Sequence, residues 1–189
     1  MKSRLLRSAA YLTALLCLAA PAHAEWVRRV TDGIMGTRII VELWSDDEAK
    51  ANRAIDALLD EMRHIDESMS TFKPTSEVSQ VNDKAANGPM KISKELFDLL
   101  TTAKQYSVIT DGAFDITYAS VGYLYDFRKH VHPNEAQIDK ALPAVDYHHV
   151  LLDPKNQTVQ FSQKGVRIDL GDPGGQLRGR APVDDEGRE

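Results

Sequence analysis

The sequence contains only one cysteine, Cys17, among its 189 residues. A lone thiol cannot form an internal disulfide, and it cannot supply the several sulfur ligands of a structural zinc site. We also expect Cys17 to be removed with an N-terminal signal segment, which would leave the mature chain without a thiol nucleophile. The stability of the folded protein must therefore come from an ordinary packed core.

Long apolar runs are scarce, and the only one lies at the N-terminus, from Ala9 to Ala20. It follows three basic residues and precedes Ala22-His23-Ala24. A basic start, a short apolar run and an A-x-A site are typical of a secretory signal peptide, so we expect residues 1–24 to be cleaved off. An uncleaved anchor is less favoured because the run is shorter than the ~20 residues of a membrane helix. A lipoprotein attached at Cys17 is also less favoured, because the bulky Leu16 precedes it. We expect an exported, bacterial periplasmic protein.

Positive charge is in deficit, with 23 Lys and Arg against 28 Asp and Glu and a formal net charge of −5. Signal cleavage would remove Lys2, Arg4 and Arg7 and bring the balance to −8. Phosphate contacts from clustered basic residues supply most of the affinity for nucleic acids, so we expect no nucleic-acid partner. About 165 residues would remain, which is enough for one domain with a real core.

Common catalytic and metal-binding motifs are missing too. The sequence has no G-x-S-x-G, no P-loop and no G-x-G-x-x-G. His130 and His132 would point to the same face of a strand, but Asp126 is the only nearby carboxylate, so solvated loop histidines are favoured over a metal site. The adjacent His148 and His149 would face opposite sides of a strand and could not chelate one ion together.

Hydrophobic periodicity predicts the first elements. Residues 38–44 alternate as a half-buried strand does. Asp46 and Asp47 suit a helix start, and the 3–4 spacing that follows predicts an amphipathic helix. Its apolar face comprises Ile55, Leu58, Leu59, Met62 and Ile65. Residues 70–87 are polar and without period, so we expect a loop or a short irregular helix there.

Further helices and strands are predicted in the second half. Ser93 can cap a helix that ends near Thr110, and a short helix is expected within residues 132–142. The apolar face of the first of these comprises Leu96, Leu99, Leu100 and Ala103. Strands are expected at residues 148–152, 158–161 and 166–170, joined by polar turns. This order predicts an α+β fold, with helices packed on a mainly antiparallel sheet.

Residues 172–189 break with this pattern. They hold four glycines, two prolines and eight charged residues. Such a composition has too few apolar groups to pack against a sheet, so we expect a disordered tail. The expected domain therefore covers residues 25–171.

Gly112 to Thr117 is the most informative motif of the chain. Asp111-Gly112 is a turn dipeptide that directly follows a helical pattern. Phe114 and Asp115 then place an aromatic ring beside a carboxylate, a combination suited to a flat polar ligand. Alone, such a turn is more often structural than functional.

Four segments taken together carry a more specific signal. In their order and spacing they resemble the ApbE-type FAD:protein FMN transferases, a family of flavin transferases. The resemblance runs from about Val30 to Gly171 and includes the weaker pieces 124–127 and 145–147. The four segments are Met35-Gly36-Thr37, Ser70 to Asn82, Gly112 to Thr117 and Val166 to Gly171.

The resemblance implies an ApbE-like α+β fold and a set of FAD-binding residues. Met35 matches a position against the flavin, and Phe72 matches an aromatic position that packs on FAD. Ala113, Phe114 and Asp115 match a segment that lines the same pocket. Apolar and aromatic faces with a few polar groups at the edges suit the rings of such a ligand.

The resemblance also implies a reaction. The family moves FMN from FAD to a threonine hydroxyl of a target protein, releases AMP and requires Mg²⁺. The expected partners are FAD and an acceptor such as an electron-transfer flavoprotein subunit. Members act on the outer face of the inner membrane, so association with that membrane is expected too.

The chain departs from the family pattern after Gly171. There the family continues with a second glycine, a Lys-Gly pair, a hydrophobic helix and a long C-terminal half that includes metal ligands. Residues 172–176 read Asp-Pro-Gly-Gly-Gln instead, and no lysine follows Lys164. We therefore expect a truncated or frameshifted chain that lacks the C-terminal half, and a transferase of impaired activity. The alternatives are a non-catalytic periplasmic flavin-binding module, an inactive fragment, or a domain without a ligand.

Overall fold

The computed structural model describes residues 24–126 and 129–171 of the chain. Residues 1–23 of the expected signal peptide and the expected tail, 172–189, lie outside the described residues, as does Phe127 of the weaker family-like piece. Within the described ranges, no helix is both long and apolar enough to cross a membrane. The chain divides into two compact units, residues 1–64 and 65–189, and the division falls within one helix.

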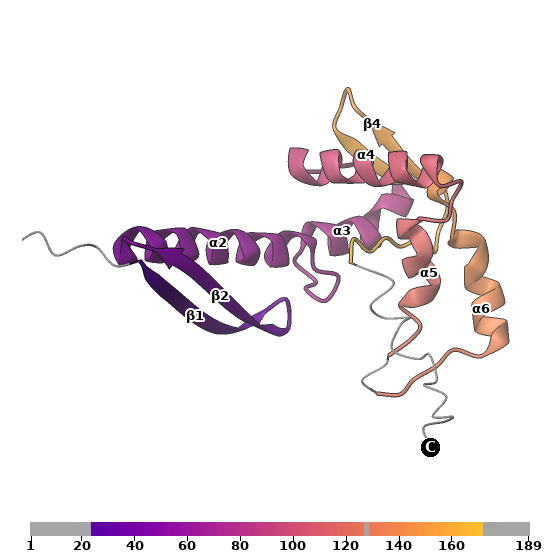
Figure 1. The fold of residues 1–189 in the computed structure, drawn as a ribbon. Coiled ribbons are helices and arrows are strands. Elements are labelled where there is room, and N and C mark those ends of the chain that lie inside the picture. Colours follow the sequence, from indigo (N-terminus) through magenta and orange to yellow (C-terminus); the bar gives the residue numbers. More distant parts are fainter. Residues whose placement is uncertain (1–23, 127–128, 172–189) are drawn as a thin grey trace, which may run out of the picture. The chain divides into compact units, whose positions relative to one another are not determined.

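The first unit is a β-hairpin packed on a helix. Strand β1 (Glu25–Ile34) pairs antiparallel with β2 (Thr37–Ser45), and α2 (Glu48–Met69) follows. Figure 1 shows the hairpin alongside α2. The alternation of β2 turns Ile39, Val41 and Leu43 toward the helix, where they pack with others around a small buried cluster. That cluster comprises Ile34, Ile55 and Leu59.

The sequence predicted β2 and α2, and both are confirmed. Two details differ. No strand was predicted before residue 38, yet β1 is the longer strand of the hairpin. Leu58 was placed on the buried face of the helix but is 45% exposed, because the narrow hairpin covers only the stripe that carries Ile55 and Leu59.

The Met35-Gly36 dipeptide forms the turn of the hairpin. Ile34 pairs with Thr37, which leaves Met35 and Gly36 as a two-residue loop. Both have positive φ, 53° and 68°, as the central residues of a type I′ hairpin turn require. Positive φ is unusual for methionine, so the fold holds Met35 in a conformation that a side chain rarely adopts.

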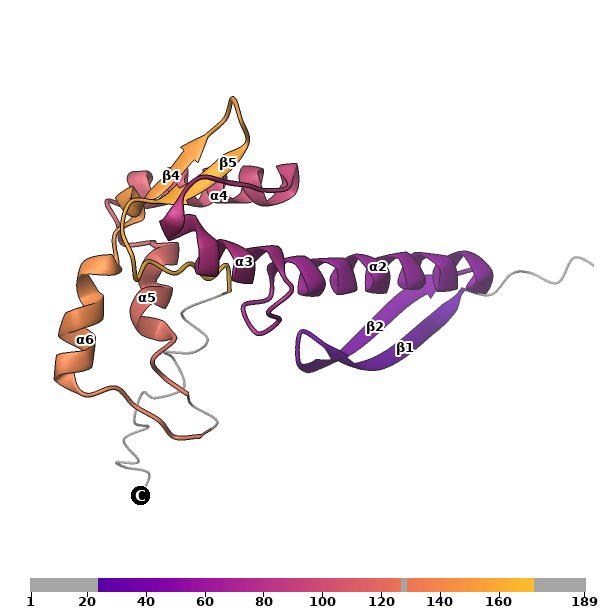
Figure 2. The ribbon, with the colours of Figure 1, turned by 180° about the vertical axis from the view of Figure 1, so that it is seen from behind.

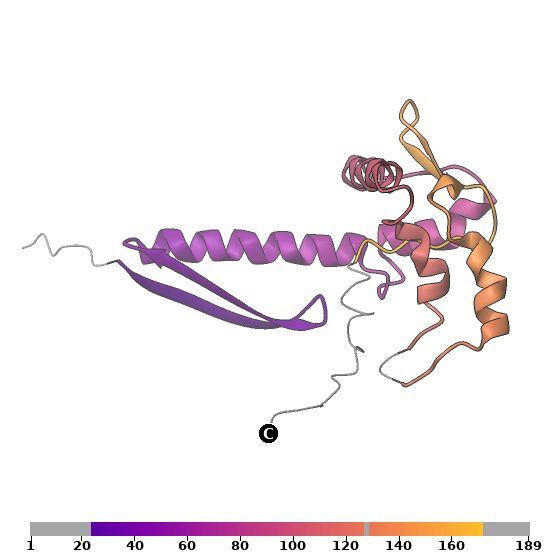
Figure 3. The same ribbon diagram turned by 45° about the vertical axis from the view of Figure 1, so that its right-hand side comes forward.

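In its described residues, the second unit combines the end of α2 and the helices α3 to α6 with a small antiparallel sheet (Figure 2). The sheet has the strand order β3-β5-β4. Its strands are β3 (Met90–Lys91), β4 (Val150–Asp153) and β5 (Thr158–Phe161). The helices are α3 (Glu77–Lys84), α4 (Lys94–Ile109), α5 (Ala119–Gly122) and α6 (Glu135–Ala141). Figure 3 shows the two short helices α5 and α6 next to each other. Short 3₁₀ turns occupy Ala85–Asn87, Ile116–Tyr118, Leu142–Ala144 and Tyr147–His149.

One hydrophobic cluster holds the second unit together. It joins α3 and α4 to the sheet and to the segment 166–170. Its members with 1% exposure or less are Val78, Val81, Ala85, Leu96, Leu100, Val159, Phe161 and Ile168. The α+β class and the antiparallel pairing predicted from the sequence are confirmed, although the described strands form two separate sheets.

Helix boundaries in this unit follow the sequence closely. Ser93 caps α4 as predicted and accepts a hydrogen bond from the Leu96 N–H at 3.1 Å. Leu99 was predicted to be buried but is 38% exposed, because it borders a cavity. The polar stretch 70–87 contains the regular helix α3, capped by Ser76. Only two apolar residues, Val78 and Val81, anchor α3, which made its period hard to see.

The histidine pairs do not lie on strands. His130, with φ 54° at a turn, and His132 are both exposed outside strands, which agrees with the favoured prediction of loop histidines and not with the strand geometry that a metal site would have needed. Strand β4 begins at Val150, two residues later than predicted. His148 and His149 lie in the 3₁₀ turn before it, because Asp146 caps that turn by accepting the His148 N–H at 2.8 Å.

The predicted strand 166–170 was also wrong. The segment has no strand partner in the described residues, and its backbone groups bond to side chains and to a loop instead. The Arg167 N–H donates to Ser120 Oγ at 2.9 Å, and the Asp169 N–H donates to the Ile116 carbonyl at 3.1 Å. The alternation of Val166 and Ile168 reflects burial against the core and not pairing in a sheet.

Candidate functional site

The turn after α4 returns the chain against that helix. Gly112 adopts φ 79°, and its N–H donates to the Ser107 carbonyl at 2.8 Å, which closes the end of α4. The Phe114 N–H then donates to Thr110 Oγ1 at 3.0 Å. The Phe114 ring consequently meets the ring of Tyr106 edge-on, with centroids 6.3 Å apart.

The Asp115 carboxylate fixes the next step of the chain. One oxygen accepts from the N–H and the hydroxyl of Thr117, at 2.7 and 2.6 Å. The other accepts the N–H of Tyr147 at 2.8 Å, 32 residues away. Bonds to a charged acceptor are the stronger kind, so Asp115 ties two loops together.

A cavity of about 180 Å³ lies behind Phe114, and we call it the Phe114 cavity. Helix α4 forms one wall and the turn after it forms the second. The third wall is the end of the segment 166–171. The lining residues are Leu99, Thr102, Ala103, Tyr106, Phe114, Asp115, Ile116, Tyr118, Asp169, Leu170 and Gly171.

The segment that carries Phe72 reaches the same place. Thr71 Oγ1 donates to Asp169 Oδ2 at 3.4 Å, and the other Asp169 oxygen accepts the Gly171 N–H at 2.8 Å. Phe72 follows directly and is 82% exposed. The segments around residues 115 and 169 therefore line the Phe114 cavity, and the segment around residue 71 contacts its wall through Asp169.

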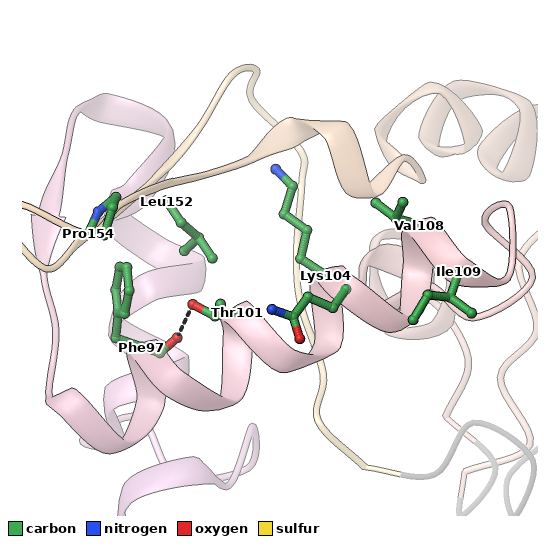
Figure 4. Close-up of a pocket in the computed structure, with 8 residues that line it drawn as sticks. Phe97, Thr101, Lys104, Val108, Ile109, Leu152 and Pro154 are labelled. Carbon is green, nitrogen blue, oxygen red and sulfur yellow. Dashed lines mark hydrogen bonds between the residues drawn. The ribbon is translucent and has the colours of Figure 1, made fainter.

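A larger groove lies along a different face of α4, and we call it the Phe97 groove. Its volume is about 560 Å³, and it runs between α4 and the β4–β5 hairpin (Figure 4). Phe97, Leu152 and Pro154 line one end, and Val108 and Ile109 line the other. Its one charged lining group is already engaged, because Lys104 Nζ donates to the Val150 carbonyl at 2.5 Å. That contact covers an edge of the sheet, which is a common way to protect an edge strand.

Two carboxyl groups near these features have shifted pKa values. The pKa of Asp146 is lowered, first by the hydrogen bond from the His148 N–H, an effect that burial partly opposes, and then by the His148 ring. The pKa of Asp153 is lowered by the bond from the Asn156 side chain and by the Lys155 N–H. Both groups accept bonds within tight turns, so these shifts indicate loop structure and not catalysis.

The comparisons with known proteins identify the family. The sequence matches the ApbE family over residues 35–173. The chain belongs to the ApbE family. The FAD:protein FMN transferase of Klebsiella pneumoniae (strain 342) is 29% identical over 140 residues, which cover 73% of this chain and 43% of that protein. The protein of the same name from Escherichia coli (strain K12) is 26% identical, over 80% of this chain and 45% of its own length.

Solved ApbE structures share the fold. The ApbE protein of Thermotoga maritima aligns with a TM-score of 0.64 and 28% identity, covering 78% of this chain and 47% of that one. The flavin transferase ApbE of Vibrio cholerae aligns with a TM-score of 0.65 and 23% identity, covering 78% and 48%. The chain thus spans about half the length of the ApbE proteins that it matches.

The structure brings some of the predicted ApbE site residues together. Phe114 and Asp115 line one cavity. Ala113 is exposed at the turn beside them, and its N–H donates to the Thr110 carbonyl at 3.1 Å. Phe72 stands next to the Thr71–Asp169 contact. Met35 belongs to the first unit, at the tip of its hairpin. All five stay predictions as FAD-binding residues.

Sequence reasoning did not name several residues of the lining, among them Tyr106 and Asp169. Tyr106 was missed because it was assigned only to the helix pattern, although an aromatic residue one turn before the Asp-Gly motif was a usable signal. Asp169 was assigned to a strand in the family-like segment, and its place on the cavity wall depends on the path of that segment.

The described residues offer no ready metal site. In 24–126 and 129–171, no group of three or more His, Cys, Asp or Glu side chains could hold an ion. The residues in these ranges therefore do not fit the Mg²⁺ that the ApbE resemblance implies.

Proposed function

We propose that this chain provides the flavin-binding part of an exported FAD:protein FMN transferase. The observation that carries the proposal is the Phe114 cavity, where two family-like segments about 55 residues apart in sequence form facing walls. Relatives that bear this name match the chain across most of its length.

The chemistry of the cavity suits one end of FAD. Its walls combine three aromatic residues, Tyr106, Phe114 and Tyr118, with aliphatic groups and the carboxylates of Asp115 and Asp169. A volume of about 180 Å³ is below the roughly 300–1,000 Å³ of pockets that enclose a drug-sized ligand. The cavity would therefore hold a single ring system, and the rest of FAD would extend along the surface past the exposed Phe72.

The proposed reaction is a phosphoryl-group exchange. A threonine oxygen of the target would attack the phosphorus of the FMN half of FAD, forming a new O–P bond. The bond to the bridging oxygen of the pyrophosphate would break, AMP would leave with that oxygen, and the threonine proton would pass to a base or to solvent. Mg²⁺ and an electron-transfer flavoprotein subunit as acceptor enter this proposal only through the family resemblance.

Binding of FAD is the first test. We expect purified protein to bind FAD, as measured by quenching of flavin fluorescence, and Phe114→Ala to weaken binding roughly tenfold because one ring wall is lost. Val108→Ala, on the same helix but in the Phe97 groove, should bind like wild type. Equal weakening in both variants, or no FAD binding by wild type, would contradict the assignment of the cavity.

Transfer is tested separately. The protein, FAD and Mg²⁺ are incubated with a threonine-bearing flavoprotein subunit, and covalent FMN is followed by in-gel fluorescence and mass spectrometry. Transfer supports the enzyme. Binding without transfer supports the non-catalytic flavin-binding module.

The proposed location is the periplasm, with an association with the outer face of the inner membrane. It is supported by the signal-like residues 1–24. Fractionation of cells that express the full chain should release a protein cleaved after Ala24 into the periplasmic fraction, with its new N-terminus confirmed by mass spectrometry. An uncleaved cytoplasmic product would overturn this proposal.

A further inference from the structure

One side chain takes the place of a neighbouring strand beside the Phe114 cavity. Ile168 is completely buried and lies in the extended segment that has no strand partner in the described residues. Asn82 Nδ2 donates to the Ile168 carbonyl at 2.9 Å, and the Ile168 N–H donates to Asn82 Oδ1 at 2.7 Å. The amide thereby reproduces the two bonds that a paired residue exchanges in an antiparallel sheet.

This contact has only one workable orientation. The Ile168 N–H needs the Asn82 oxygen, and the Ile168 carbonyl needs the Asn82 NH₂ group, so a flipped amide would lose both bonds. The helix that presents Asn82 is well fixed. Ser76 caps α3, and Val78 and Val81 are completely buried. A rigid element therefore holds the amide against Ile168.

The position of Ile168 decides the position of the cavity wall. Asp169, Leu170 and Gly171 follow it directly, and all three line the Phe114 cavity. Ser120 holds Arg167 from one side, but Asn82 is the group that satisfies both backbone polar groups of Ile168.

We propose that Asn82 is a positioning residue for flavin binding. It lies outside the lining of the Phe114 cavity and acts through Ile168, whose backbone it clamps so that Asp169 to Gly171 stay in place as the wall. This inference rests on the proposed function, because the wall that Asn82 holds is part of the proposed FAD site.

The test uses Asn82→Asp in the full chain. At pH 7.5 the aspartate keeps an acceptor for the Ile168 N–H but turns a second oxygen toward the Ile168 carbonyl, so we expect roughly tenfold or more weaker FAD binding. The Ile168 carbonyl repels the charged form and raises the pKa of the introduced carboxyl above its ordinary value, and the protonated acid again offers one donor and one acceptor. The ratio of variant to wild-type affinity should therefore recover as the pH falls from 7.5 to 5.

Asn87→Asp is the matched control. Asn87 is exposed at the end of the 3₁₀ turn Ala85–Asn87, and the substitution adds the same charge away from Ile168. It should leave FAD affinity unchanged at every pH. A residue that only supports folding would lower the thermal midpoint without restoring affinity at low pH.

Two results would overturn the inference. The first is FAD binding by Asn82→Asp within twofold of wild type at pH 7.5. The second is unchanged amide hydrogen exchange of Ile168 to Gly171 in Asn82→Asp, whereas faster exchange supports the clamp. This measurement decides even if wild type binds no FAD, which would be the failure of the proposed function itself.

Discussion

At the scale of single residues, the polar side chains of this protein hold loops in place. Asp115 joins its own turn to Tyr147, and Asn82 substitutes for a strand at Ile168. Asp146 holds a single tight turn, because its carboxylate accepts hydrogen bonds from the backbone N–H and the ring Nδ1 of His148, at 2.8 and 2.7 Å. Removing such a group costs more than the bond itself, since a partner is left unsatisfied.

The lowered pKa of Asp146 gives a prediction about pH. A carboxyl whose folded pKa is below its ordinary value of 3.8 stabilises the fold above that value and loses this contribution as the pH falls through its folded pKa. Asp146→Asn removes the charge. The unfolding free energy of this variant should therefore fall less than that of wild type between pH 6 and pH 3. The difference should be under about 1 kcal/mol, because solvent screens the group.

Urea unfolding at the two pH values measures this difference. Asp139→Asn, on the exposed side of α6, is the control for the loss of one negative charge. If the unfolding free energies of Asp146→Asn and wild type change identically with pH, the Asp146 carboxylate does not contribute to the pH dependence of stability.

At the scale of elements, the start of α4 is joined to the start of α3. The Ser93 N–H and hydroxyl donate to the two oxygens of Glu77, at 2.6 and 2.5 Å. The Ser93 oxygen also accepts the Leu96 N–H as the helix cap. Both helices contribute to the same core cluster, and this contact holds their N-terminal ends together.

Ser93→Ala should accordingly cost about 0.5–2 kcal/mol of unfolding free energy, the usual range for a lost N-cap. Glu77→Ala should cost less. The double variant should fall short of the sum of the two, because the shared contact can be lost only once. Guanidinium unfolding of the four proteins measures the coupling. Strict additivity would show that the Ser93–Glu77 contact contributes nothing in solution.

At the scale of the whole molecule, the two units have very different cores. The first is held by three buried residues, Ile34, Ile55 and Leu59, with partly buried neighbours. The cluster of the second unit has fourteen buried members, so far more apolar surface leaves water there. Local opening of a segment becomes easier as fewer buried contacts hold it.

Native-state hydrogen exchange should therefore be faster in β1 and β2 than in β5 and the centre of α4. Ile55→Ala should accelerate exchange in the hairpin further and cost roughly 2–4 kcal/mol locally. It should leave the protection of β5 unchanged. Hairpin amides as protected as those of β5 would show that the small cluster is not the weaker one.

Much of the local structure could be predicted from the sequence. The caps and periodicities of α2 and α4 are short-range signals, so their boundaries followed from residues such as Ser93. The elements that were missed or wrong depend on partners far away in the chain. Strand β1 needs β2 beside it, and α3 has only Val78 and Val81 to mark its buried face.

The candidate site divides in the same way. The sequence determined the family-like segments and the Asp-Gly turn, because glycine at φ 79° and the polar groups around it act within a few residues. Only the tertiary structure decided that Tyr106, Phe114 and Asp169 share one cavity, and that residues 166–170 are held by side chains and not by a strand. The physical reason is that side-chain hydrogen bonds such as that of Asn82 span 86 residues, and no local pattern encodes a contact of that length.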